Sequence, residues 1–162
     1  RRKILVENGI LRGFMHNIET ASRMGVEPNG SARAETYQNI PIVRMSNTYI
    51  SPGDWRFEEM IEDIDKGIYA KGSVYGYVDP AKGQFMFKPE EAYMIENGEL
   101  TSLLQEAAIS GLTLEVLKNT EAVGRDFQML DPGFCGKSLQ NARVNDGGPH
   151  IKAKEMVFGG MK

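Results

Sequence analysis

The stretch that decides the fold is AYMIENGELTSLL, residues 92–104. Both of its arms are rich in residues that favour strands, and Asn97-Gly98 separates them. Asn and Gly tolerate the positive φ angles of a two-residue type I′ turn, which matches the twist of paired antiparallel strands. We therefore expect a β-hairpin with strands over residues 92–96 and 99–104.

Two further stretches carry the same kind of signal. Residues 4–15 have Asn8-Gly9 between two apolar runs, and residues 74–87 have the turn sequence Asp-Pro-Ala-Lys-Gly at 79–83. The motifs at residues 6–9 (VENG) and 95–98 (IENG) are near copies, which indicates one turn chemistry used twice. Strand-like composition also returns at residues 43–50 and 151–157, whereas residues 26–41 have the composition of a long loop.

Three short helices fit between these strands. Asn17 is a suitable N-cap for a helix over residues 18–24 that ends at Gly25. Asp54 is the expected cap of a second helix, which Gly67 would end, and a third is expected over residues 114–122 with Gly124 after it. The second helix has one apolar face, formed by Phe57, Met60, Ile61 and Ile64.

The composition supports a globular α+β fold. We expect a mainly antiparallel β-sheet with hairpins and two or three short helices, in a single domain over residues 1–162. With 41% hydrophobic and 25% charged residues, the chain has enough apolar side chains for a core. Its 18 glycines favour turns and strands over a helical bundle.

The same numbers exclude several classes of function. The net charge of −3, without a basic stripe, argues against nucleic-acid binding. No apolar run approaches the length of a membrane span, so no membrane partner is expected. A lone cysteine cannot form an internal disulfide, and we expect a cytoplasmic protein. The start at Arg1, without Met, suggests a chain excised from a longer one.

Cys135 is the residue most suited to chemistry, and two interpretations stay open. A free cysteine is usually a small buried hydrophobic residue. Gly133, Gly136 and Lys137 instead suggest an exposed turn with a positive charge nearby, which favours a thiolate that could bind a metal or act as a nucleophile. Gly136-Lys137-Ser138 matches the end of a P-loop, but Asp131 occupies the first glycine position and would repel phosphate.

The two histidines, His16 and His150, have no metal-ligand spacing. His16 follows an apolar strand, which is typical of a polar residue at a strand end. His150 lies in a turn that leads into a strand, and it could meet Cys135 and a carboxylate as a triad, although the spacing does not require this.

Several segments together resemble the C-terminal portion of the TldD/PmbA family. Individually they are weak, but they occur in the family's order and cover nearly the whole chain. They are DPGFCGK (131–137), GGPHI (147–151), Gly159-Gly160, VENGIL (6–11), RMSNTY (44–49), GIY (67–69) and EAYMIENG (91–98).

This resemblance implies a chemistry. TldD-like proteins resemble zinc peptidases that act on unfolded or modified peptides, and their metal site combines an H-E-x-x-x-H helix with a cysteine near the C-terminus. That cysteine falls on Cys135, which is the predicted metal ligand. The H-E-x-x-x-H helix has no match here, because neither His16 nor His150 begins such a motif.

The resemblance therefore implies that this chain is one part of a metallopeptidase and is inactive alone. We expect it to supply one zinc ligand and part of a peptide-binding cleft, with no catalytic residue of its own, and we cannot assign substrate-binding residues. A homo- or heterodimer with a TldD/PmbA-like subunit is expected. The alternative is a non-catalytic PmbA (TldE)-like interaction subunit that docks a peptidase partner. The family is also named as a modulator of DNA gyrase, but the net charge argues against direct DNA binding.

Overall fold

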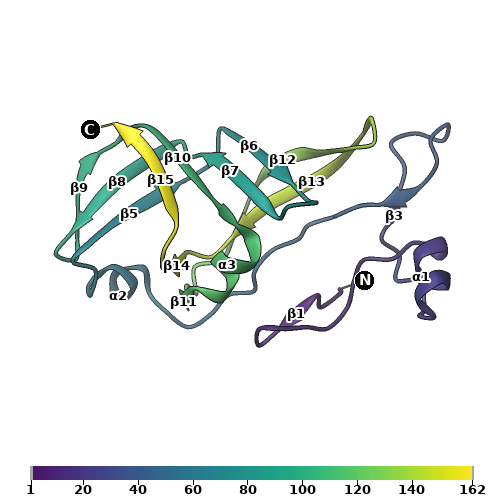
Figure 1. Cartoon of the computed structure of the whole chain (residues 1–162), viewed down its shortest axis with the longest axis horizontal. Helices are drawn as coiled ribbons and strands as arrows, with labels where there is room; N and C mark the ends of the chain where they lie inside the picture. The colour runs from purple at the N-terminus through teal and green to yellow at the C-terminus, as the bar shows by residue number, and fades with distance from the viewer. Residues whose placement is uncertain (1, 162) are drawn as a thin grey trace. The chain divides into compact units, whose positions relative to one another are not determined.

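The computed structural model describes residues 2–161, so Arg1 and Lys162 lie outside the described part. The fold is α+β, with three short helices among antiparallel strands, as the sequence predicts (Figure 1). The described residues form two compact units that alternate along the chain. Unit 1 comprises residues 2–51 and 128–148, and unit 2 comprises residues 52–127 and 149–161. The single domain over residues 1–162 remains a prediction.

Unit 1 contains one long hairpin and several short elements. The long hairpin pairs β12 with β13, and each of the other two pairs has strands of two residues. Its elements are β1 (Val6–Glu7), β2 (Ile10–Leu11), α1 (Ile18–Met24), β3 (Ala32–Arg33), β4 (Ile42–Val43), β12 (Gln128–Lys137) and β13 (Gln140–Gly148).

Hydrogen bonds between residues 33–47 and the long hairpin connect the short elements of unit 1 to it. The buried Arg44 donates from Nη1 to the carbonyl of Gln140 at 3.1 Å. Gln140 in turn accepts the backbone N–H of Glu35 at 3.1 Å, and Lys137 donates to the carbonyl of Val43 at 2.8 Å. Segments almost a hundred residues apart in the sequence therefore share one set of hydrogen bonds.

Unit 2 is built on two antiparallel sheets and one small pair of strands. The four-stranded sheet has the order β15-β10-β7-β6, the three-stranded sheet has the order β5-β8-β9, and β11 pairs with β14. Its strands are β5 (Lys66–Lys71), β6 (Tyr75–Asp79), β7 (Gln84–Lys88), β8 (Glu91–Glu96), β9 (Glu99–Leu103), β10 (Gln105–Leu112), β11 (Thr120–Val123), β14 (Ile151–Ala153) and β15 (Val157–Met161). Its helices are α2 (Phe57–Ile61) and α3 (Thr113–Lys118).

The turns predicted from the sequence are confirmed. Asn8-Gly9 joins β1 to β2, residues 80–83 join β6 to β7, and Asn97-Gly98 joins β8 to β9. Asn8 and Asn97 have φ angles of 51° and 52°, the left-handed values that a type I′ turn requires. Helix α1 also forms as predicted: the Asn17 side chain accepts the N–H of Thr20, and Gly25 closes the helix with φ 64°.

The predictions for the other two helices need correction. α2 begins after Arg56 and not after Asp54. The Glu59 carboxylate accepts the backbone N–H of Arg56, which gives a donor at the start of the helix its hydrogen-bond partner. The helix ends at Ile61, and Gly67 lies inside strand β5. α3 covers residues 113–118, and residues 120–122 at the end of the predicted helix belong to β11 instead, which pairs with β14.

Strand predictions also fail in two places. The sequence predicts a strand over residues 43–50, but only Ile42 and Val43 pair with another strand. The residues that follow do not continue it, because side chains such as that of Arg44 bind the long hairpin. The sequence did not predict β12 and β13, because Pro132 and several glycines interrupt the strand pattern. The structure accommodates Pro132 next to a register shift between residues 129 and 132, a place where a strand tolerates a missing N–H.

Candidate functional site

Cys135 lies inside β12, two residues before the strand ends at Lys137, rather than in the exposed turn that its glycine neighbours suggested. It is opposite Ala142 in the ladder, and it is a free, half-buried thiol. Ser138 and Leu139, with φ angles of 51° and 59°, form the turn itself. β12 leads into this turn and not into a helix, so the P-loop interpretation is excluded by the structure as well.

Arg44 fixes the backbone of Cys135. Its Nη2 donates to the carbonyl oxygen of Cys135, and its Nη1 donates to that of Gln140. Arg44 is 2% exposed, so these bonds hold both strands of the hairpin from within unit 1. A buried guanidinium needs acceptors for its donors, and two carbonyl oxygens serve Nη1 and Nη2 here. The buried Nε has no hydrogen-bond partner among the described residues. The side chain of Arg44 therefore positions the backbone of Cys135.

Cys135 alone does not complete a metal site. Zinc in proteins usually takes three or four side-chain ligands. Among residues 2–161, no group of three or more His, Cys, Asp or Glu side chains is placed to hold a metal ion. Cys135 is the only predicted ligand in the described part of the chain, and its ligand role stays a prediction.

His150 belongs to a different constellation, in unit 2. Its backbone N–H donates to Oδ1 of Asp126 at 3.1 Å, and its Nδ1 bonds Oδ2 of the same carboxylate. Its Nε2 lies 2.9 Å from the hydroxyl of Tyr69. Since an ionised carboxylate only accepts, Nδ1 carries the proton, and in the neutral ring Nε2 accepts from Tyr69. Both ring nitrogens are engaged, so His150 is not free to activate Cys135 in the triad considered from the sequence.

Aromatic rings surround this Tyr69-His150-Asp126 relay. Phe57 packs against Tyr69 and His150 with centroid distances of 4.9 and 4.7 Å, and Tyr93 stacks on Tyr69. Burial raises the pKa of Tyr69, so the phenol stays protonated and can donate to His150. Burial would raise the pKa of Asp126 too, but the hydrogen bonds from the His150 side chain and backbone outweigh it and lower that pKa.

His16 has a structural role. It is 6% exposed, its backbone N–H donates to Asn29 Oδ1 at 2.9 Å, and its Nδ1 lies 3.2 Å from Thr20 Oγ1. The ring therefore packs at the start of α1 and connects it to the loop that follows.

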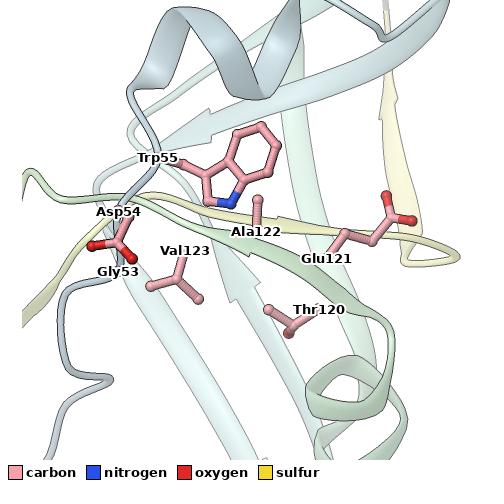
Figure 2. A pocket seen from close by; sticks show the side chains of 7 residues that line it. All are labelled: Gly53, Asp54, Trp55, Thr120, Glu121, Ala122 and Val123. Carbon is pink, nitrogen blue, oxygen red and sulfur yellow. The ribbon is translucent and has the colours of Figure 1, made fainter.

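A shallow hollow of about 260 Å³ lies in unit 2, where residues 53–55 run beside β11 (Figure 2). Figure 2 shows the indole of Trp55 with Asp54 and Glu121 on either side of it. Glu121 pairs with Lys154, whereas the Asp54 carboxylate makes no hydrogen bond or ion pair within the described part of the chain. An indole face beside a free carboxylate suits a positively charged group.

Comparison with known proteins identifies the family. Residues 1–160 match the family model described as the PmbA/TldA metallopeptidase C-terminal domain. The chain belongs to this family. A metalloprotease of Methanocaldococcus jannaschii is 52% identical over 152 residues, which are 94% of this chain and 33% of that protein. A zinc metalloprotease TldD homolog of Saccharolobus solfataricus is 40% identical over 156 residues, 96% of this chain and 35% of that protein.

Solved structures show the same fold. TldE from Thermococcus kodakarensis superimposes with a TM-score of 0.73 at 24% identity, over 98% of this chain and 33% of that one. A Thermotoga maritima protein described as a candidate modulator of a DNA gyrase gives a TM-score of 0.70 at 27% identity, over 97% of this chain and 32% of that one. This PmbA/TldA-family chain thus spans about a third of the length of the relatives it matches.

Sequence reasoning missed the partners of His150 and the role of Arg44. Asp126 and Tyr69 lie 24 and 81 residues from His150, and no spacing rule connects residues so far apart. Arg44 belongs to a segment that the family resemblance singled out, but its hydrogen bonds to the cysteine hairpin appear only in the structure. None of the described helices of this family member is long and apolar enough to cross a membrane.

Proposed function

We propose that this chain is the C-terminal part of a zinc-dependent peptidase that acts on unfolded or modified peptides. In this proposal Cys135 is one of the metal ligands, and the remaining ligands and the general base come from another part of the protein. The zinc ion, when bound, would supply an activated water to the peptide carbonyl. The chain has no peptidase activity by itself, because it offers one thiolate where catalytic zinc needs three protein ligands.

The family match over residues 1–160 is the observation that carries this proposal. Relatives at 40–52% identity are named metalloproteases, and one is named a zinc metalloprotease. The geometry of Cys135 is consistent with a ligand role. The residue is half-buried near the end of a strand, and Arg44 fixes its backbone, as a metal ligand requires for a defined geometry.

The sheets of unit 2 suggest how such a protein would hold a peptide. β6 and β9 are outer strands of their sheets, and every residue of β9 is exposed. An extended peptide could pair with such an edge through backbone hydrogen bonds, which do not depend on the peptide sequence. Unfolded peptides are the substrates that can present an extended backbone, so we favour them over folded proteins.

A second candidate function is a non-catalytic subunit that docks a peptidase partner. The structural similarity to TldE supports it at the level of fold alone. Presence of Cys135 favours the metal-binding branch, and homo- or heterodimers with a TldD/PmbA-like subunit suit either function. We place the protein in the cytoplasm, since its one thiol needs no oxidising compartment.

The test is zinc content per protein, measured together with hydrolysis of a denatured protein substrate. The protein that carries this chain should hold stoichiometric zinc and cleave the substrate. Cys135→Ser should lose most of both, because a hydroxyl is a poor replacement for a thiolate, and Cys135→His should restore part of the zinc. Thermal unfolding should change little in either variant, because the metal would not hold the core together.

Two results would overturn the proposal. One is unchanged zinc content and cleavage in Cys135→Ser. The other is cleavage by residues 1–162 alone, which would show that the described chain carries a complete active site. Zinc-free protein that still binds a TldD-like partner would favour the docking subunit.

A further inference from the structure

A second hollow, of about 330 Å³, lies in unit 1 between residues 33–35 and the β12–β13 hairpin. Phe134 and Arg143 face each other across the two strands and line it together. Asn141 lies two residues before Arg143, on the same face of β13. The hollow is therefore built on a regular pair of strands, and residues 134 and 143 are adjacent to the ladder pair that contains Cys135.

The guanidinium of Arg143 is the unused polar group of this hollow. Its Cζ lies 5.7 Å from the centre of the Phe134 ring, so the ring supports the planar group from one side. The Arg143 side chain makes no hydrogen bond or ion pair with any group whose placement the structure describes, although its carbonyl oxygen accepts from Arg33. Five N–H donors in a fixed planar arrangement remain available to an anion.

The other charged groups of the lining are already engaged. Arg33 donates to the carbonyl oxygens of Met45 and Arg143 at 3.0 and 2.7 Å, and Glu35 accepts the backbone N–H of Asn141 at 2.9 Å. Among the lining residues the charges are therefore two positive and one negative, in a chain whose net charge is −3. The hollow attracts an anion while the rest of the chain carries a net negative charge.

Phe134 favours a ligand that has an apolar part beside its anionic group. Phe134 is 68% exposed, and the Arg143 guanidinium is the one ring or cation partner of its side chain among the described residues. A ligand that fills the hollow can bury the remaining face of the ring. Phosphate or another small inorganic anion would leave this face in water, whereas a peptide would cover it with the carbon atoms beside its carboxylate.

We propose that this hollow binds a carboxylate of a peptide, with Arg143 as the anion-binding residue and Phe134 as the apolar contact beside it. The choice of a peptide as ligand rests on the proposed function. The carboxylate belongs to either an acidic side chain or the C-terminus of the peptide, and both fit a planar guanidinium in a bidentate manner. The hollow is then a determinant of peptide specificity that is separate from the metal ligand Cys135.

Binding can be measured by calorimetry on the metal-free protein that carries this chain, so that no cleavage occurs. The probes are acetyl-AAEAA-amide, its Gln counterpart acetyl-AAQAA-amide, and acetyl-AAAAA with a free or an amidated C-terminus. We expect binding to the Glu peptide, to the free C-terminus, or to both, to be about tenfold tighter than to the matched neutral peptide. The peptide that shows the preference identifies the source of the carboxylate.

Variants assign the preference to the hollow. Arg143→Gln should abolish it, and Arg143→Lys should retain only part, because an ammonium lacks the planar pair of donors. Glu35→Gln should strengthen binding of the anionic peptide by removing the one negative charge of the lining. Arg23→Gln is the matched control, since Arg23 is an exposed arginine of unit 1 whose one ion-pair partner among the described residues is Glu19.

Equal affinity for anionic and neutral peptides would overturn the inference, and so would an unchanged preference in folded Arg143→Gln, with folding checked by circular dichroism. Failure of the proposed function looks different. In that case the zinc-loaded protein cleaves no peptide and Cys135→Ser changes nothing, whereas the preference for anionic peptides and its loss in Arg143→Gln persist.

Discussion

Asp126 holds His150 through both the ring and the backbone of that residue. One carboxylate oxygen accepts the backbone N–H of His150 at 3.1 Å, and the other bonds Nδ1. This pair of bonds fixes the tautomer of the ring and leaves Nε2 directed at the hydroxyl of Tyr69. These bonds connect three parts of unit 2. Tyr69 lies in strand β5, Asp126 follows β11, and His150 directly precedes β14.

The carboxylate of Asp126 should contribute measurably to stability. We expect Asp126→Asn to lower the free energy of unfolding by about 1 kcal/mol, since hydrogen bonds to charged groups are stronger than neutral ones but this one is partly open to solvent. Urea unfolding is the measurement, and Asp65→Asn at an exposed position is the matched control. An equal shift in the two variants would contradict the contribution of the Asp126–His150 bonds.

The same pair predicts a pH dependence. The pKa of Asp126 is lower in the folded state than in the unfolded chain, where it is about 4. Its contribution is therefore fully present above pH 4 and is lost as the pH falls through the folded pKa. Melting temperatures measured from pH 7 down to pH 2.5 should show the difference between wild type and Asp126→Asn shrinking below pH 4. A difference that stays constant across this range would contradict the lowered pKa.

Tyr69→Phe removes only the hydroxyl that meets His150. We expect a loss of about 0.5–1.5 kcal/mol, because the aromatic packing against Phe57 and Tyr93 remains. A double-mutant cycle with Asp126→Asn should give a coupling energy of at least about 0.5 kcal/mol, since both bonds act on one imidazole. Strictly additive effects would show that the three side chains do not act as a relay.

Substitution of Arg44 should lower the free energy of unfolding far more than substitution of an exposed arginine. Arg44→Gln leaves the carbonyl oxygens of Cys135 and Gln140 without their buried donors, and we expect a loss of about 2–4 kcal/mol by urea unfolding. Arg23→Gln, on the exposed face of α1, should cost less than about 0.5 kcal/mol. Similar losses in the two variants would mean that Arg44 does not hold the hairpin.

The two Asn-Gly turns allow a comparison in which the local sequence is matched. Gly9 and Gly98 have φ angles of 74° and 79°, so Gly→Ala is strained at both by about 1 kcal/mol. A Cβ at Gly9 meets no atom within 4 Å, whereas one at Gly98 would lie 2.7 Å from the carbonyl oxygen of Glu62. Gly98→Ala should therefore destabilise the protein more than Gly9→Ala. The reverse order in thermal unfolding would contradict the close approach at Gly98.

Local signals predicted the parts of the fold that local chemistry determines. Asn97-Gly98 specifies a turn whatever surrounds it, and Asn17 with Gly25 specifies both ends of one helix. The β12–β13 hairpin has no such signal: Ser138 and Leu139 form its turn although neither is a typical residue for positive φ. Hydrogen bonds from residues 33–47 stabilise this hairpin, and pairing over such sequence distances cannot be inferred from periodicity.

The candidate site also combines features that a local segment predicts with features that depend on long-range contacts. The family resemblance singled out Cys135 from a short segment, and its role as a metal ligand stays a prediction. The hollow beside Arg143 and the relay at His150 depend on contacts between residues far apart in the chain. The residues involved are present in the sequence, but no pattern in it indicates which of the many carboxylates, tyrosines and arginines contact one another.

The alternation of the two units along the chain has a consequence for synthesis on the ribosome. The partners of Arg44 lie at residues 135 and 140, about 90 residues later, so unit 1 cannot close until nearly all of unit 2 has been made. Most of unit 2 emerges in between, but its last strands, β14 and β15, follow after unit 1 is complete. Neither unit can finish folding during translation before the last quarter of the chain appears, and contacts over such distances fold slowly. Until then the nascent chain exposes unpaired strands, so its folding yield depends on protection of those strands from other chains.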